Sequence, residues 1–204
     1  MIERTGTKEK ILDTAETLFG MNGFDSVSLR EITTGAGVNL AAVNYHFHSK
    51  DALIDAVIAR RIEPVNRYRM EMLDAAGPSP TVEQLLDAFL RPVFEIKLHS
   101  MAPLMGRVLS NPDMFVDRLF NVHLAPVAAR FSAAFSIAMP ELPMVDILWR
   151  MHFSVGVMTH TLLWGNVFPR MTQGLCTIDD REALLRRTVQ FLAAGFRTPA
   201  SNPH

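Results

Sequence analysis

Residues 39–50 combine hydrogen-bonding, aromatic and small side chains at helical spacing. At 100° per residue, Leu40, Val43 and Phe47 lie within about 60° of one another, which predicts the face that packs inward. The opposite face and its flanks, which we expect to be exposed, carry Ala41, Ala42, Asn44, Tyr45 and His46. Alanine lets a backbone approach a DNA groove closely, whereas Tyr, His and Asn can bond to phosphates or base edges. This segment could therefore contact nucleic acid.

Anion-binding and capping residues flank the same segment. Ser28 and Arg30 stand at the start of a preceding helix, where free backbone N–H groups attract anions, and Lys50 stands at the start of the following helix. Asn39 is expected to cap the short helix between them. The candidate DNA-binding residues are therefore Ser28, Arg30, Asn39, Ala41, Ala42, Asn44, Tyr45, His46 and Lys50.

Helix start and stop signals are dense before residue 51. Ser28-Leu-Arg-Glu31 is a capping box, Gly35-Ala-Gly37 breaks the chain before Asn39, and Ser49 caps the next helix. Residues 28–47 therefore read as a helix, a tight turn and a second helix, which is the arrangement of a helix-turn-helix unit. On spacing alone, the same pattern also fits a helical hairpin buried in a core.

Helical periodicity continues along the rest of the chain and no alternating strand pattern persists, so the expected fold class is all-α. Gly77-Pro-Ser-Pro80 is the clearest linker, and Thr81 caps the helix after it. We expect Pro64 to bend or end the fourth helix, and Pro92 and Pro126 to kink two later ones. The later helices are predicted near residues 81–100, 103–110, 112–138, 143–168 and 179–197.

Composition and charge set limits on the class of protein. Nearly half of the 204 residues are apolar, which is typical of a folded globular chain. The net charge is −1, and residues 1–70 carry nine Lys or Arg against nine Asp or Glu, so the usual basic footprint of a DNA-binding protein is missing. Any DNA contact must depend on where a few cations are placed. The single cysteine, Cys176, and the lack of a secretory pattern indicate a reducing cytoplasm.

Membrane, metal and enzyme functions find little support in the residues. The longest uncharged run, Met151 to Pro169, contains several polar side chains, so we expect a buried helix or a subunit interface and no membrane span. The pairs His46/His48 and His152/His160 lack the i, i+4 spacing and the acidic partner of a helical zinc site. Phosphate-loop and nucleophile motifs are missing as well. We therefore expect no metal, no cofactor and no catalytic residue, and so not an enzyme.

A series of short motifs runs through the first 60 residues. These are Ile11-Leu-Asp-Thr-Ala-Glu-Thr-Leu-Phe19, Gly23-Phe24, Ser28-Leu-Arg-Glu-Ile32, Ala36-Gly-Val38, Val43-Asn-Tyr-His-Phe47, Ser49-Lys50 and Leu53. The series resembles the TetR family of one-component regulators. One position departs, because the family usually has tyrosine two residues before the His-Phe pair, where this chain has Asn44 with Tyr45 beside it. The phosphate contact usually assigned to that tyrosine could move to Tyr45.

The resemblance implies a three-helix DNA-binding domain over residues 1–60, with its helix-turn-helix at about 28–47, and a larger helical ligand-binding and dimerisation domain over 61–204. It implies operator DNA as a partner and a homodimer formed by helices near 143–168 and 179–197. In the family, ligand binding moves the fourth helix and carries the DNA-binding domains away from operator spacing. In two-state terms, the effector binds the DNA-incompetent state better and shifts the population toward it.

The C-terminal half is rich in Met, Phe and Trp, which suit an adaptable apolar pocket, although for any single residue an ordinary core with a dimer contact is favoured. Arg107 stands in an apolar stretch and could hold a ligand carboxylate or phosphate, pair with Glu95 or Asp113, or point to solvent. The candidate ligand-binding residues are Met101, Met105, Arg107, Phe131, Trp149 and Phe153.

Two functions remain open at this stage. The first is a ligand-responsive DNA-binding regulator, expected to be a repressor that an apolar small molecule releases from its operator. Residues 37–47, 148–153 and 191–195 resemble the branch of the TetR family that includes regulators of fatty-acid metabolism, which implies a long-chain acyl effector. The alternative is a helical protein that binds apolar ligands and has no sequence-specific DNA function. Operator binding separates the two.

Overall fold

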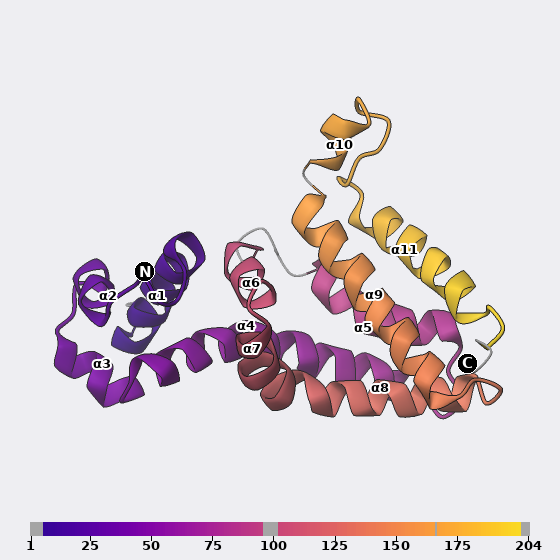
Figure 1. Cartoon of the computed structure of the whole chain (residues 1–204), viewed down its shortest axis with the longest axis horizontal. Helices are drawn as coiled ribbons and strands as arrows, with labels where there is room; N and C mark the ends of the chain where they lie inside the picture. The colour runs from indigo at the N-terminus through magenta and orange to yellow at the C-terminus, as the bar shows by residue number, and fades with distance from the viewer. Residues whose placement is uncertain (1–5, 96–101, 166, 201–204) are drawn as a thin grey trace. The chain divides into compact units, whose positions relative to one another are not determined.

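The computed structural model describes residues 6–95, 102–165 and 167–200, and within these ranges the chain is helical without any strand (Figure 1). The expected all-α class is confirmed. The helices are α1 (Thr7–Asn22), α2 (Leu29–Ala36), α3 (Leu40–Phe47), α4 (Lys50–Ala75), α5 (Val82–Glu95), α6 (Ala102–Leu109), α7 (Pro112–Met114), the π-helix η2 (Phe115–Leu124), α8 (Ala125–Ala138), α9 (Met144–Trp164), α10 (Phe168–Met171) and α11 (Arg181–Phe196).

These helices form two compact units. Unit 1 comprises the described residues of Met1–Pro64 and His99–His123, and unit 2 comprises those of Val65–Leu98 and Leu124–His204. Helix α4 has 26 residues and contributes its first part to unit 1 and its last part to unit 2. The domain boundary expected near residue 60 stays a prediction.

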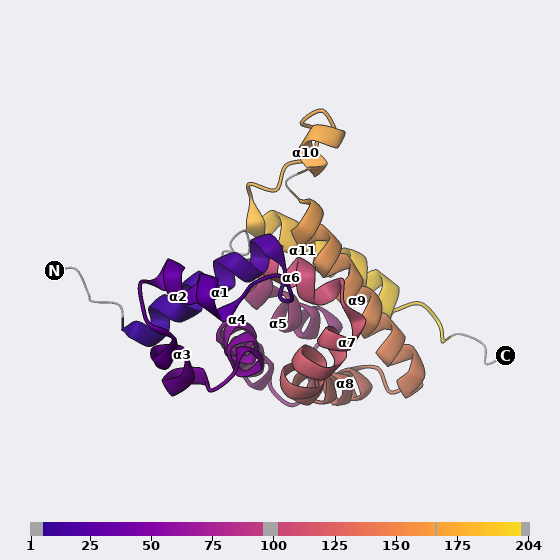
Figure 2. The ribbon, with the colours of Figure 1, turned by 60° about the vertical axis from the view of Figure 1, so that its left-hand side comes forward.

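Unit 1 is built on the apolar face of α1, and α1 contacts both α2 and α3 (Figures 1 and 2). Its apolar residues recur at three and four positions, which places them on one side of the helix. Helices α2, α3 and α4 add further side chains to the same core. The buried core side chains are Ile11, Leu12, Ala15, Phe19, Ile32, Val43, Phe47, Leu53, Val57 and Ile58.

Four expected helix caps are confirmed. In each, a side-chain oxygen accepts a hydrogen bond of 2.9–3.2 Å from the backbone N–H three residues later, which satisfies one of the free donors at the helix start. The capping residues are Ser28, Asn39, Ser49 and Thr81. Gln84 also accepts a hydrogen bond from the Thr81 backbone N–H at 2.8 Å, which makes this start a second capping box that the sequence did not lead us to expect.

A buried carboxylate ties α1 to α4. Glu16 is 7% exposed, and its two oxygens accept hydrogen bonds from Arg60 Nη2 at 2.5 Å and from Arg61 Nε at 2.7 Å. Arg60 also pairs with the exposed carboxylates of Glu9 and Asp13. Burial of the Arg60 guanidinium lowers its pKa, but the hydrogen bonds to Glu16 and Asp13 outweigh this effect, so the pKa of Arg60 is raised. The charge of Arg60 is therefore well compensated.

Residues from the middle of the chain complete unit 1. Helix α6 contacts α1, and Arg107 Nη2 donates a hydrogen bond of 3.1 Å to the backbone oxygen of Met21. Arg118 in η2 pairs with Asp51 at 2.8 Å and with Asp55 at 2.7 Å. The segment is thereby attached to the end of α1 and to the first two turns of α4.

Unit 2 has a core of α5, α8, α9 and α11, to which the last part of α4 adds Val65 and Leu73. Helix α11 packs on α5 and on α9, beside which it runs in both views (Figures 1 and 2). Aromatic pairs fill the core: the Phe89 and Phe131 rings meet edge to face at 5.2 Å between centroids, and the Phe135 and Phe196 rings stack at 4.5 Å. All four side chains are buried, so these contacts fix how the helices of unit 2 pack.

Three proline positions test the expected breaks. Helix α4 continues through Pro64, and Pro92 lies inside α5, so neither residue ends its helix. The helix expected over 112–138 is divided into α7, η2 and α8. Pro126 is the second residue of α8, and the ten residues before α8 are π-helical. The kink expected at Pro126 stays a prediction.

Helix α9 contains most of the uncharged run that begins at Met151, and it ends at Trp164. Among the described residues, no helix combines the length and the apolarity that crossing a membrane would require.

Glu16→Gln should lower the free energy of unfolding by about 2 kcal/mol, because it leaves two partly buried guanidinium groups without their shared carboxylate. The matched control is Asp13→Asn, which removes an exposed partner of Arg60 and should cost less than about 0.5 kcal/mol. Urea denaturation of both variants checks this, and equal effects of the two changes would contradict the role given to Glu16.

Candidate nucleic-acid interface

Helices α2 and α3 form a helix-turn-helix unit. Each has eight residues, and the turn between them passes through Gly37 in the left-handed conformation at φ 65°. Glycine adopts this conformation without the steric cost that a Cβ would bring. The Val38 N–H donates to the Thr33 oxygen at 3.0 Å, and the Asn39 side chain then caps α3. Local chemistry thus closes the turn and begins the second helix.

The packing face of α3 is only partly as predicted. Val43 and Phe47 are buried, as expected, but Leu40 is 50% exposed. The prediction that Leu40 packs inward is wrong. Leu40 is the first residue of α3, so it lies at the end of the helix and not between buried turns. Two residues one turn apart therefore anchor α3.

The opposite face of α3 presents the expected polar and small side chains. Ala41, Asn44 and Tyr45 are exposed, whereas Ala42 and His46 are half-buried. Tyr45 is 79% exposed, and its ring meets the His46 imidazole edge to face at 5.0 Å between centroids. This face offers a phenol hydroxyl and a carboxamide beside a small residue, which suits contacts to phosphates and base edges.

Ser28 is occupied by its own cap. Its hydroxyl donates to Glu31 Oε2 at 2.7 Å, and its backbone N–H donates to the same oxygen at 2.7 Å. These backbone and hydroxyl donors, with the nearby Lys50 charge, lower the pKa of Glu31. A phosphate at Ser28 would meet that carboxylate, so Ser28 is better placed as a cap than as a phosphate ligand.

Two cations lie at the starts of helices. Arg30 is exposed in the first turn of α2. Lys50 is half-buried at the start of α4, and its Nζ donates to the Asp25 backbone oxygen at 3.4 Å, a long hydrogen bond that a phosphate could replace. Arg30 and Lys50 are therefore the two candidate cations that remain available for phosphate contacts.

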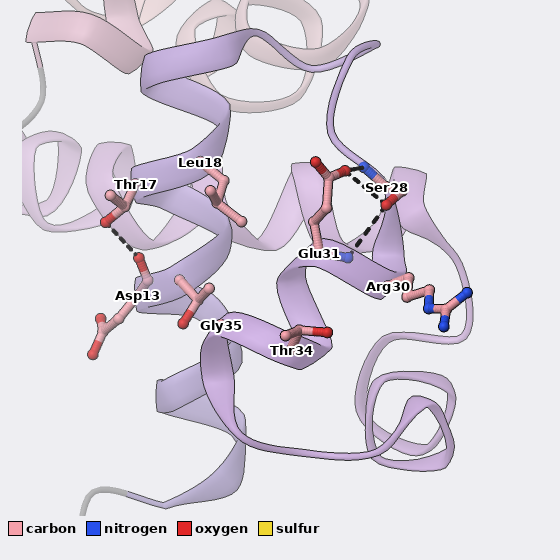
Figure 3. A pocket seen from close by; sticks show the side chains of 9 residues that line it. Asp13, Thr17, Leu18, Ser28, Arg30, Glu31, Thr34 and Gly35 are labelled. Atoms are coloured by element: carbon pink, nitrogen blue, oxygen red, sulfur yellow. Dashed lines mark hydrogen bonds between the residues drawn. The ribbon is translucent and has the colours of Figure 1, made fainter.

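An open groove of about 740 Å³ lies between α1 and α2 (Figure 3). Thr14 and Gly35 stand where the two helices come closest, since a Cβ on Gly35 would lie 2.8 Å from the Thr14 methyl. The groove also carries the carboxylates of Asp13 and Glu31, and the Arg30 side chain extends away from α1 (Figure 3). Its acidic lining makes it a poor phosphate site.

The candidate ligand-binding residues fall into different surroundings. Phe131 is fully buried in the core of unit 2, whereas Trp149 and Phe153 are more than half exposed and stack on each other at 5.8 Å between centroids. Arg107 is exposed in unit 1 and donates to a backbone oxygen. Met101 lies outside the described residues, as does the side chain of Met105. Their roles stay predictions.

A stripe of exposed apolar side chains runs along α9, and we call it the α9 stripe. Four members lie along the first part of α9 and two near its end, and helical geometry places them on the side of α9 that faces away from the core of unit 2. Phe191 on α11 is exposed as well, at 68%. The α9 stripe consists of Val145, Leu148, Trp149, Phe153, Leu163 and Trp164.

The sequence did not predict the buried charged residues, Arg69 and Glu16 among them. Arg69 lies in the last part of α4 and is 5% exposed. It follows Arg67 and Tyr68, and this polar neighbourhood gave no signal of burial. Two of the residues that it contacts, Phe89 and Met158, lie 20 and 89 positions away along the sequence, so only the fold reveals these contacts.

Two protein-family models match the chain. The model described as "Tetracyclin repressor-like, C-terminal domain" matches residues 87–195, which is more than half of the chain. The model described as "Bacterial regulatory proteins, tetR family" matches residues 11–57, which include α2, the turn and α3.

Individual proteins give the same picture. The "Probable HTH-type transcriptional regulator YttP" of Bacillus subtilis is 30% identical over 93 residues, which are 46% of this chain and 43% of that protein. The chain thus spans less than half the length of this curated relative.

Two solved structures share the fold. The repressor SmeT of Stenotrophomonas maltophilia has a TM-score of 0.67 at 19% identity, covering 98% of this chain and 97% of its own. The fatty acid degradation regulator FadR of Bacillus halodurans has a TM-score of 0.63 at 16% identity, covering 96% and 98%.

Proposed function

This chain belongs to the TetR family of bacterial regulatory proteins, and we propose that it is a homodimeric transcriptional repressor that an apolar small molecule releases from operator DNA. The observation that carries the proposal is the α3 helix. It is capped by Asn39, anchored by Val43 and Phe47, and keeps Tyr45 almost fully exposed. A helical hairpin that only packed in the core would not need an exposed tyrosine on its second helix.

In this proposal, α3 enters the major groove. Ala41 and Ala42 let the backbone approach, and their methyls can pack on a thymine methyl. Tyr45 and Asn44 are both exposed, so the phosphate contact usually given to a tyrosine one position earlier falls to Tyr45. Arg30 supplies a phosphate contact that fixes the register of the protein on the duplex.

The α9 stripe and Phe191 are proposed to form the dimer interface with a second copy. Exposed apolar stripes of this extent are unusual on a monomeric protein and are typical of interaction sites. Aromatic residues are enriched at such interfaces, and the stripe contributes Trp149, Phe153 and Trp164. Both helices lie within the part of the chain that the C-terminal family model matches, except for the last residue of α11.

The effector is proposed to bind in unit 2 and to act on unit 1 through α4, which belongs to both. Within unit 1, the ion pairs of Arg118 with Asp51 and Asp55 attach η2 to the start of α4, close to α3. An effector that favours a different position of α4 would bind one state better than the other and so shift the population. A long-chain acyl compound is one apolar candidate.

Selection of genomic DNA fragments with the purified protein tests the function. We expect enrichment of a palindrome whose half-sites are separated by whole helical turns, with roughly 10³-fold discrimination over a scrambled fragment. The result follows from a dimer that presents two copies of α3. If ligand-free protein enriches no sequence, the result favours the alternative function, a helical protein that binds apolar ligands and has no operator.

Lys50→Ala should weaken binding to operator and scrambled DNA alike and lower the salt slope by about one, because it removes one phosphate contact. Tyr45→Ala should weaken operator binding by about tenfold. Fluorescence anisotropy over a salt series checks both variants. Arg130→Ala, which removes an exposed cation of unit 2, is the charge-matched control and should leave affinity unchanged. If Lys50→Ala and Tyr45→Ala also leave affinity unchanged, the assignment of this face is wrong.

Phe191→Glu should convert the dimer to monomers at micromolar concentration, since it buries a carboxylate in an apolar interface. Sedimentation equilibrium measures the mass. Met21→Glu places the same charge on an exposed methionine of unit 1 and should leave the dimer intact. A dimer that persists in the Phe191 variant would refute this interface.

A further inference from the structure

Arg69 is a buried cation in the core of unit 2. It is 5% exposed, and its guanidinium carbon lies 4.4 Å from the centre of the Phe89 ring. Its Nε donates a hydrogen bond of 2.8 Å to the Phe89 backbone oxygen. The two terminal nitrogens have weaker contacts, with Asn66 Oδ1 at 3.4 Å from Nη1 and with Met158 Sδ at 3.7 Å from Nη2.

No carboxylate among the described residues pairs with Arg69. Elsewhere in unit 2, Arg91 contacts three carboxylates, those of Asp87, Glu95 and Glu182, although it is more exposed. Burial lowers the pKa of Arg69 to about 10, and no opposite charge counters this effect. The guanidinium remains charged at neutral pH, so its charge is buried without a counter-charge.

A buried cation of this kind is costly unless an anion compensates it. The guanidinium matches a carboxylate in particular, because two of its N–H groups can donate in parallel to the two oxygens. The two terminal nitrogens of Arg69 keep N–H groups for this, since each makes a single long contact and one of these is to a thioether. Met158 is flexible, so its sulfur can move from Nη2 while Nε keeps its bond to Phe89.

We propose that Arg69 binds the carboxylate of the effector, and that the effector is an organic carboxylate with an apolar body. The apolar body follows from the surroundings, because the side chains of Phe89 and Met158 that contact Arg69 belong to the apolar core. This inference rests on the proposed effector-binding role of unit 2. It also places the carboxylate ligand away from Arg107, which the sequence analysis offered as one possible ligand of a carboxylate and which lies exposed in unit 1.

Isothermal titration calorimetry of the ligand-free, full-length protein tests the inference. The probes are decanoate and decan-1-ol, which share the apolar body and differ in the carboxylate. Wild type should bind decanoate about tenfold tighter than decan-1-ol, the difference expected for one charge-assisted pair. Arg69→Met should lose this preference while its affinity for decan-1-ol stays within about twofold. Arg186→Met makes the same change at an exposed arginine of unit 2 and should keep the preference.

Thermal unfolding of the ligand-free variants separates ligand binding from a structural role. Arg69→Met should unfold at or above the wild-type temperature, because it removes an uncompensated buried charge and keeps an apolar side chain of similar length. Arg69→Lys keeps the charge without the two parallel donors, and it should show a reduced preference for decanoate. If Arg69→Met does not fold, Arg69→Lys replaces it in the comparison of decanoate with decan-1-ol.

Equal affinities of wild type for decanoate and decan-1-ol, or a preference unchanged in both Arg69 variants, would overturn the inference. The same holds if neither probe binds. Failure of the proposed function looks different, because operator binding is measured without ligand. A protein that prefers decanoate through Arg69 but selects no operator keeps this inference and refutes the repressor. A protein that selects an operator but shows no preference for decanoate keeps the repressor and refutes this inference.

Discussion

The contact between α1 and α4 through the buried Glu16 carboxylate is the interaction on which the geometry of unit 1 depends. Helices α2 and α3 have eight residues each, too few to be stable alone in water, so their positions come from the core that α1 and α4 provide. The exposed face of α3 can keep one orientation only because Val43 and Phe47 are held in that core.

Helix α4 carries arginines in two opposite electrostatic situations. Arg60 and Arg61 share the Glu16 carboxylate in unit 1, and their charges are compensated within the protein. Arg69, about two turns later in unit 2, meets a carbonyl oxygen, an amide oxygen, a thioether and an aromatic face. The ion pairs of Arg60 and Arg61 with Glu16 suit a permanent contact. The uncompensated charge of Arg69 suits an anion that binds and dissociates. One continuous helix thus joins a fixed contact to a proposed variable one.

Local signals could be predicted from the sequence, and distant contacts could not. Ser28, Asn39, Ser49 and Thr81 cap helices through bonds that span three residues, so a short window of sequence contains both partners. Leu40 was misassigned because a helical wheel does not show where the core ends. Arg69 was missed because Phe89 and Met158 lie 20 and 89 residues away. The candidate site on α3 was accessible to sequence reasoning for the same reason as the caps, since it is local.

The exposed face of α3 carries no Lys, Arg, Asp or Glu, and the cations beside it are few. A protein with few phosphate contacts displaces few counterions, so its nonspecific affinity for DNA is low at physiological salt. Such a molecule would slide only briefly along the chromosome and would make most of its search by diffusion through solution. In the proposed repressor, a larger share of the molecules would then be off DNA at any moment, where the proposed effector could bind them.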